Sequence, residues 1–240
     1  MLHTTQGIVL HNVKYSDKRI ISKIYTKDFG LLRLNITVGN APKSKIKAGI
    51  IQPLSQLEFI LSIKENKEVH QLVEAKSIYS YQHLSTDFYK LCIAQFINEV
   101  LYRCLKEQTR NEELYEFVTN IFQWLDSNDK NFSDLHLYFL FAFSKYLGFY
   151  PLNNYSPANK YFDAREGQYH SYSQSFPLSF DEKQSRLFLQ LFSFSLNDHQ
   201  PFNRMDRLDL LECLMVYYKF HIPGLNEFKS FNVLQETLNT

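Results

Sequence analysis

Five short segments in the first 80 residues alternate between apolar and polar side chains. The clearest is 32–38, and similar segments run over 4–14, 19–27, 57–63 and, more weakly, 69–78. A period of two is typical of a half-buried β-strand. No stretch between these segments is long enough for a helical crossover between parallel strands. The pattern therefore predicts a small closed or nearly closed antiparallel barrel.

The strand number narrows the choice of barrel. An OB-fold has five strands and fits best, although an SH3-like barrel fits the same pattern. The composition of Tyr15-Ser16-Asp17-Lys18 predicts a turn between the first two strands. Asp28-Phe29-Gly30 predicts a hairpin turn before the third strand, with glycine supplying the unrestricted φ. Residues 1–80 are expected to form an OB-fold nucleic-acid-binding domain.

The apolar period becomes helical from about residue 84. It predicts helices over about 88–103, 114–125 and 134–147, and again over 182–196, 204–221 and 226–238. Residues 150–180 are rich in Asn, Ser, Tyr and Pro and have little periodicity, apart from a possible hairpin through 161–162 and 169–170. The fold class is therefore α+β, with a helical bundle domain over 81–240 that this irregular excursion interrupts.

Charge is distributed unevenly along the chain. Residues 1–80 hold 12 Lys+Arg against 6 Asp+Glu, whereas 81–240 hold 14 against 19. This asymmetry indicates a basic binding module joined to a more acidic body, although chance would also produce it.

Cysteine usage and hydropathy predict the compartment. The three cysteines (Cys92, Cys104 and Cys213) include no C-x-x-C pair, so neither a disulfide framework nor a zinc ribbon is expected. No basic leader precedes a long apolar core, and the longest apolar run, 137–143, is far below the roughly 20 residues that span a bilayer. A cytoplasmic protein without membrane contact is expected.

Motifs for catalysis are weak. Phosphate-binding loops need closely spaced glycines, and here no two glycines are closer than nine residues. His221 and Cys213 are better explained as packed residues than as metal ligands. The acids of 206–212, interleaved with Arg204 and Arg207, predict a solvated, salt-linked helix face. No enzymatic activity is expected.

The candidate binding residues are the cations and two tyrosines of the predicted barrel. Lysine tracks phosphates without demanding one base identity, and tyrosine rings stack on bases. The bland interpretation is a lysine-rich solvated surface with Tyr25 in the core. The predicted DNA-binding set is Lys14, Lys18, Arg19, Lys23, Arg33, Lys43, Lys45 and Lys47, with Tyr15 and Tyr25.

Three stretches resemble the bacterial recombination-mediator family RecO, in a form like that of the Bacteroidetes. They are GIVLHNVKYSDKRIISKIYTKDFGLLRL, PKSKIKAGIIQPLSQLEFIL and YYKFHIPGLNEFKSFNVL, and the similarity runs nearly end to end. No single motif is diagnostic, but their order and spacing follow the family.

The resemblance implies an N-terminal OB-fold, a helical domain and a role in DNA repair and recombination. It implies binding to single- and double-stranded DNA, annealing of complementary strands without ATP, and action with RecR to help RecA displace single-strand-binding protein. Lys43, Lys45 and Lys47 match the family's basic loop, and Lys14, Lys18 and Arg19 match its first turn.

One feature departs from the family. Many relatives carry a four-cysteine zinc site after the segment Gly148-Phe149-Tyr150-Pro151, but this chain has no cysteine between Pro151 and Pro177. No cofactor is therefore expected. The sequence leaves two other functions open: a non-catalytic protein-interaction module with a basic barrel surface, and a nuclease or ligase-like enzyme, against which the missing motifs argue.

Overall fold

The structure is a computed structural model. It describes residues 1–16, 18–39, 46, 48–63, 67–106, 109–175, 177–196, 201–225 and 227–238. The chain divides into two compact units, Met1–Ser127 and Asn128–Thr240. Each unit is described by itself.

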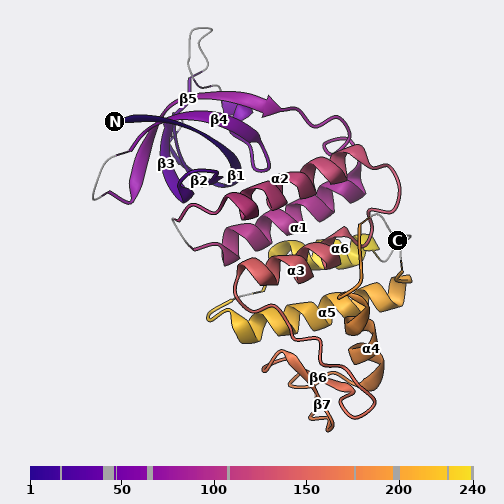
Figure 1. Ribbon diagram of the computed structural model, residues 1–240. Helices are drawn as coiled ribbons and strands as arrows, with labels where there is room; N and C mark the ends of the chain where they lie inside the picture. Colours follow the sequence, from indigo (N-terminus) through magenta and orange to yellow (C-terminus); the bar gives the residue numbers. More distant parts are fainter. Residues whose placement is uncertain are drawn as a thin grey trace. The chain divides into compact units, whose positions relative to one another are not determined.

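The first unit contains a closed five-stranded barrel (Figure 1). Its strands are β1 (Leu2–Ser16), β2 (Arg19–Thr26), β3 (Gly30–Thr37), β4 (Gln56–Ser62) and β5 (Val69–Tyr79), and a short 3₁₀ helix, η1 (Ala48–Ile50), precedes β4. The strand order is β1-β2-β3-β5-β4, with β4 paired back to β1. The predicted OB-like barrel is confirmed, with strand bounds within a few residues of those expected.

One pairing differs from the expected antiparallel barrel. β3 and β5 run parallel, with Arg33 opposite Val69 and Asn35 opposite Gln71. The reason is geometric, because five strands cannot alternate in direction all the way around a closed ring. One neighbouring pair must be parallel, and the β3–β5 pair fills that role.

The barrel interior is filled by the inward-facing apolar residues of all five strands. Ile24, Leu34, Phe59 and Leu61 are completely buried there. Each side chain of this size contributes about 1.5–3 kcal/mol when fully buried. Gly30 has a φ of 63°, a left-handed conformation that most side chains disfavour, and it makes the tight β2–β3 turn possible.

Two helices of the first unit cover part of the barrel's outer surface. They are α1 (Phe88–Cys104) and α2 (Glu112–Ser127), drawn beside the strands in Figure 1. Asn98 of α1 donates a 2.7 Å hydrogen bond from Nδ2 to the carbonyl oxygen of Leu10. Tyr25 packs near Tyr115 of α2, with ring centroids 6.3 Å apart. Ile8, Leu10 and Tyr25 are buried as a result.

Asp126, near the end of α2, fixes the connection between the barrel and α1. Its carboxylate accepts hydrogen bonds from the backbone N–H groups of Gln82, His83 and Leu84, at 2.8–3.1 Å. It also accepts one from the Tyr79 hydroxyl at 3.1 Å. Burial alone would raise the pKa of Asp126, but the backbone hydrogen bonds outweigh it and hold the pKa below its usual value.

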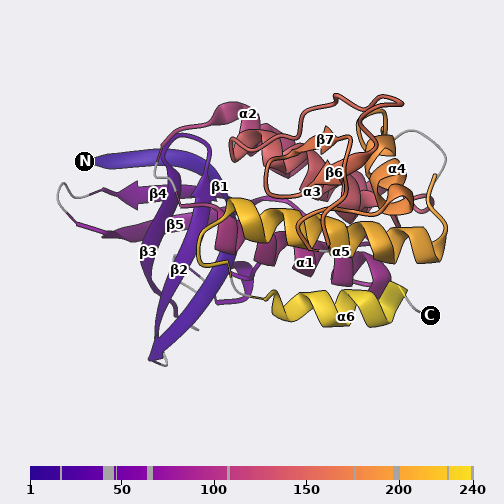
Figure 2. The same cartoon turned by 90° about the horizontal axis from the view of Figure 1, so that it is seen from below.

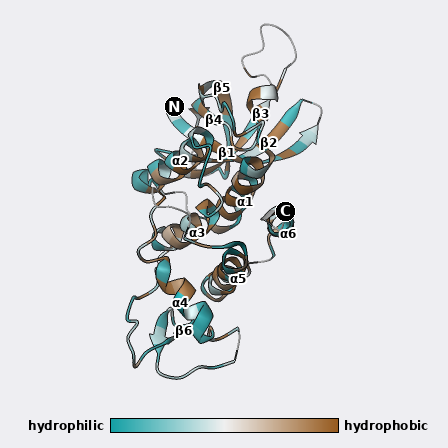
Figure 3. Ribbon diagram, turned by 90° about the vertical axis from the view of Figure 1, so that its right-hand side faces the viewer, coloured by the Kyte–Doolittle hydropathy of each residue, from teal (hydrophilic) through white to brown (hydrophobic). Residues whose placement is uncertain are grey.

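The second unit is helical and contains the predicted excursion. Its elements are α3 (Leu135–Tyr146), β6 (Tyr161–Asp163), β7 (Gln168–His170), α4 (Glu182–Gln190), α5 (Arg204–His221) and α6 (Lys229–Leu238). The β6–β7 hairpin lies beside α4 and α5 in Figures 1 and 2. The segment around β6 is mostly hydrophilic in Figure 3. The hairpin expected at 161–170 is confirmed.

An aromatic cluster holds the hairpin against these helices. The Phe162 ring lies 4.2 Å from that of Phe188 in α4 and 5.7 Å from that of Tyr217 in α5, measured between centroids. Phe180 stacks on Phe162 at 5.4 Å. Packing of rings therefore gives the excursion its shape.

Two helix predictions need correction. The predicted helix 182–196 ends at Gln190, where Leu191 and Phe192 continue as a turn. The predicted solvated face of α5 is also wrong at Arg207, which is buried. Its Nε lies 2.6 Å from Oδ1 of Asp134, whose side chain is 1% exposed. Burial raises the pKa of Asp134 despite this guanidinium.

Candidate nucleic-acid interface

The β-register brings three basic side chains into one line on the outer barrel surface. Lys23 of β2 lies opposite His11 of β1 on one side and opposite Arg33 of β3 on the other. We call these three residues the cationic row. Like charges directly opposite each other destabilise a sheet. A row of this kind is suited to an anionic ligand.

Aromatic and acidic neighbours partly offset the positive charge of the cationic row. The Lys23 ammonium lies 4.4 Å from the centroid of the Tyr102 ring, and the His11 ring lies 4.4 Å from the same ring. Nη1 of Arg33 lies 3.3 Å from Oε2 of Glu68, in an ion pair that is half or more exposed. Exposed pairs of this kind contribute little to stability, so a phosphate could replace the carboxylate.

Burial and a neighbouring positive charge lower the pKa of two members of the row. Burial and then the nearby Arg33 lower the pKa of Lys23. Burial and then Lys23 lower the pKa of His11, which favours the neutral imidazole. A bound phosphate would oppose both effects, because it stabilises the charged forms.

A β-bulge places His11 in the cationic row. Val9 pairs with Ile24 and His11 pairs with Lys23, so two steps along β1 correspond to one step along β2. Leu10 is the extra residue, and it reverses the side on which the following residues point. Unbroken alternation along β1 would place Val9, His11 and Val13 on one side of the strand. Instead, Val9 lies in the core and His11 lies outside.

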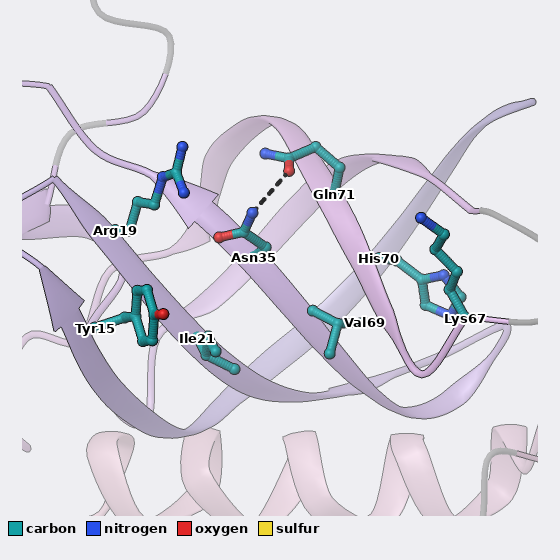
Figure 4. A pocket seen from close by; sticks show the side chains of 8 residues that line it. All are labelled: Tyr15, Arg19, Ile21, Asn35, Lys67, Val69, His70 and Gln71. Atoms are coloured by element: carbon teal, nitrogen blue, oxygen red, sulfur yellow. Dashed lines mark hydrogen bonds between the residues drawn. The ribbon is translucent and has the colours of Figure 1, made fainter.

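A row of uncharged side chains follows the cationic row along the sheet. Val13, Ile21, Asn35 and Gln71 lie side by side on β1, β2, β3 and β5. Asn35 donates a 3.1 Å hydrogen bond from Nδ2 to Oε1 of Gln71 (Figure 4). The sequence pattern did not single out these two amides, although Asn35 lies two residues after Arg33 and therefore shares its side of the strand.

A pocket of about 360 Å³ opens over this uncharged row. Figure 4 shows Tyr15 and Arg19 at one side of it, Lys67 and His70 at the other, and the two amides between them. The Tyr15 ring is 73% exposed. The lining residues are Tyr15, Arg19, Ile21, Asn35, Lys67, Val69, His70 and Gln71.

The structure does not gather every predicted binding residue here. Lys14 is exposed but pairs with Ile20, on the opposite side of the sheet from Lys23. Lys18 is exposed in the turn before β2. The predicted loop residues Lys43, Lys45 and Lys47 lie outside the described residues.

Tyr25 is the clear correction within the predicted set. It shares the side of β2 that carries Lys23, as the alternation predicted, but it is only 2% exposed. Its hydroxyl donates to the carbonyl oxygen of Asn111, and α2 covers its ring. Tyr25 therefore has no free face for a base, and the core interpretation holds for it.

The excursion of the second unit does not fit a four-cysteine zinc site. Asp163, Glu166 and His170 bring potential ligand atoms within 4.8 Å of one another. However, Asp163 already accepts from the backbone N–H groups of Arg165 and Glu166, and Nε2 of His170 lies 3.0 Å from Oε2 of Glu166. This set offers no thiolate, and hydrogen bonds explain its geometry.

The three thiols show no sign of catalytic activation. Cys92, Cys104 and Cys213 are all buried. Burial raises the pKa of Cys104 to about 12, and it also raises the pKa of Cys213. A nucleophilic cysteine requires the opposite shift.

Family models match both parts of the chain. The model for "Recombination protein O N terminal" matches residues 1–81, which contain the barrel, and the one for "Recombination protein O C terminal" matches residues 85–230. The chain belongs to the RecO family of DNA repair proteins.

Curated RecO proteins are similar over nearly their whole length. A protein named DNA repair protein RecO from Phocaeicola vulgatus is 34% identical over 98% of this chain and 99% of its own. One from Bacteroides fragilis is 33% identical with the same coverage, and one from Flavobacterium johnsoniae is 31% identical over 97% of each chain. The resemblance to a Bacteroidetes-like RecO is confirmed. Within the part of the chain that the structure describes, no helix has the length and apolar character to cross a membrane.

Proposed function

We propose that this RecO-family chain is a recombination mediator that binds DNA through the outer face of its barrel. It would bind single and double strands, anneal complementary strands without ATP, and with RecR assist the loading of RecA onto strands coated by single-strand-binding protein. The cationic row carries this proposal, since three basic groups from three strands share one surface.

The mechanism is electrostatic and stoichiometric. Phosphates on His11, Lys23 and Arg33 would relieve the repulsion within the row and release counterions from the DNA. Two strands held on one basic surface repel each other less, so base pairing nucleates more easily. Lys43, Lys45 and Lys47, which lie between β3 and β4 in the sequence, add further positive charge.

The proposal assigns the chain no catalytic step and no zinc. The absence of cysteine from 151–177 and the hydrogen-bonded state of Asp163 support the second part. The helical unit would present its surfaces to protein partners in the cytoplasm, where the nucleoid DNA lies.

Salt-dependent DNA binding tests the proposal. Fluorescence anisotropy of a labelled single-stranded oligonucleotide would be titrated at several salt concentrations with wild-type protein and with Lys23→Ala/Arg33→Ala. Each phosphate contact contributes about 0.7 to the slope of log K against log salt for single strands. The double variant should therefore bind more weakly, with a slope lower by about 1.4, and should anneal complementary strands slowly.

The matched control is Lys76→Ala/Lys219→Ala, which removes the same charge from exposed positions that are not part of the row. It should bind as the wild type does. An equal loss of affinity in both double variants would mean that net charge alone determines DNA binding. Full binding and annealing by Lys23→Ala/Arg33→Ala would instead favour the protein-interaction module.

A further inference from the structure

We propose that the pocket over β1, β2, β3 and β5 holds the base of one unpaired nucleotide. We call it the nucleotide pocket, and its lining residues are those of Figure 4. This inference rests on the proposed DNA binding and specifies its ligand. The ligand is a single strand with one base turned out of its stack.

The size and lining of the nucleotide pocket suit such a ligand. Its volume, about 360 Å³, lies near the lower end of the range for small-molecule sites. Ile21 and Val69 supply an apolar wall, and Arg19 and Lys67 supply a cation on each side. A nucleotide has the matching composition, with an apolar ring face, a polar ring edge and a phosphate on either side.

The amide pair leaves hydrogen-bonding capacity for a base edge. Nδ2 of Asn35 donates to Oε1 of Gln71, and Nε2 of Gln71 donates to the carbonyl oxygen of Leu72 at 3.2 Å. Each amide nitrogen has two hydrogens, so one remains on each. Oδ1 of Asn35 adds an acceptor. A donor beside an acceptor complements the edges of nucleobases, as asparagine and glutamine do when they bind adenine.

Tyr15 is placed to stack on the same base. Its position follows from the second register shift of β1, between Lys14 and Ser16, which makes Tyr15 the extra residue beside the pocket. A ring that is 73% exposed at the wall of a pocket offers a free face. Stacking on an aromatic ring is tolerant of sequence, because every base has a π-face.

Base pairing makes the nucleotide pocket selective for single strands. In a duplex the base edge is already paired and both faces are stacked, so neither the amides nor Tyr15 could reach them. The cationic row touches phosphates, which both forms of DNA present. The cationic row therefore binds any strand, whereas the nucleotide pocket binds only a strand that has an unpaired base.

The test compares strands that differ only in their bases. A labelled oligo-dT and an abasic oligonucleotide of the same length carry the same phosphates, so contacts to phosphate alone would bind them equally. Wild-type protein should bind oligo-dT at least about fivefold more tightly. Tyr15→Ala and Asn35→Ala should each reduce this ratio toward one, while their affinity for duplex DNA stays unchanged.

Controls separate the pocket from folding and from general DNA binding. Tyr172→Ala removes another exposed tyrosine, one that belongs to the other unit, and should keep the full ratio. Thermal melts show whether each variant is folded, and Tyr15→Ala, at an exposed site, should melt like the wild type. The pair of variants keeps the test decisive if Asn35→Ala folds poorly.

Four outcomes would overturn the inference. Equal binding of oligo-dT and abasic strands by wild-type protein shows that only phosphates are read, although the proposed function would survive. An undiminished ratio in both variants places the base elsewhere. Binding of free thymidine monophosphate together with equal binding of the two strands would assign the pocket to free nucleotides. Failure to bind any DNA would remove the proposed function as well.

Discussion

His11 shows what one residue can change in a candidate site. The sequence pattern located β1 correctly, because alternation over several residues is a local property. It could not locate the bulge at Leu10, since an inserted residue is defined by pairing with β2 and not by β1 alone. The sequence therefore predicted Lys23 and Arg33 as site residues and missed the β1 histidine that completes their row.

DNA binding should strengthen as the pH falls, because of His11. The free protein holds the pKa of His11 below 6.5, through burial and Lys23. A phosphate on the row would raise that pKa, and a proton taken up on binding increases affinity as the pH is lowered from 7.5 to 5.5. Each unit of pKa increase corresponds to as much as about tenfold in affinity. Anisotropy titrations across this range would measure the gain.

The variant His11→Gln isolates this effect from the other histidines. It should show a smaller gain on acidification than the wild type, with similar affinity at pH 7.5. In the unbound protein the lowered pKa has the opposite consequence for folding. The neutral imidazole suits the folded state, so its contribution to the free energy of unfolding is fully present above about pH 6.5 and is lost as the pH falls through the lower pKa of the folded protein. Circular dichroism should therefore accompany each titration. Parallel pH profiles for the two proteins would contradict the assignment.

At the scale of elements, the sequence pattern predicted which helices and strands form better than it predicted what packs against them. The barrel strands and the six α-helices of the described residues were expected from periodicity, since each is a regular local structure. What periodicity cannot show is which neighbour covers an outward face. Tyr25 and Lys23 share one side of β2, yet α2 covers the first, whereas the second is only half-buried, with its ammonium over the Tyr102 ring.

Removing the Asp126 carboxylate should loosen the junction of β5, α1 and α2. In Asp126→Ala, the N–H groups of residues 82–84 lose their acceptor. The bond from Leu84 is buried and the other two are part-buried, and an orphaned buried group costs about 1–3 kcal/mol. We expect the free energy of unfolding to fall by about 3 kcal/mol or more. Urea denaturation at pH 7 would measure it. Asp126→Asn keeps one oxygen acceptor and should lose less.

Glu113→Ala removes an exposed carboxylate from the same helix and serves as the control. It should change stability by less than about 0.5 kcal/mol. The pKa of Asp126 is lowered in the folded state, so its stabilisation is present above pH 4 and is lost as the pH falls through the folded pKa. The wild type and Asp126→Ala should therefore converge in acid. If Asp126→Ala were less stable than the wild type by the same amount at every pH, the ionised carboxylate would not be the source of the stabilisation.

At the scale of the whole molecule, the compact units and the family models divide the chain at different places. The two family models meet between residues 81 and 85, near the predicted boundary at 80, whereas the first compact unit extends to Ser127. The predicted boundary rested on the change of period from two to 3.6. That change marks where strands give way to helices, and it carries no information on which helices pack against the barrel.

The covering helices predict how fragments of the chain behave. In a fragment of residues 1–81, Ile8, Leu10 and Tyr25 would be exposed, and the Asp126 carboxylate would be missing. Three large apolar side chains contribute about 1.5–3 kcal/mol each when buried, which is comparable to the 5–15 kcal/mol that stabilise a typical domain. Residues 1–127 retain both features and the whole cationic row.

A fragment of residues 1–127 should therefore unfold cooperatively on heating and bind single-stranded DNA with a salt slope near that of the full chain. A fragment of residues 1–81 should melt at a much lower temperature or aggregate, even though it contains every strand of the barrel. Circular dichroism melts and anisotropy on the two fragments would decide the matter. Equal melting temperatures would mean that the barrel is stable alone and that α1 and α2 only rest on it. The helices would then have to be explained by their partners and not by the folding of the site.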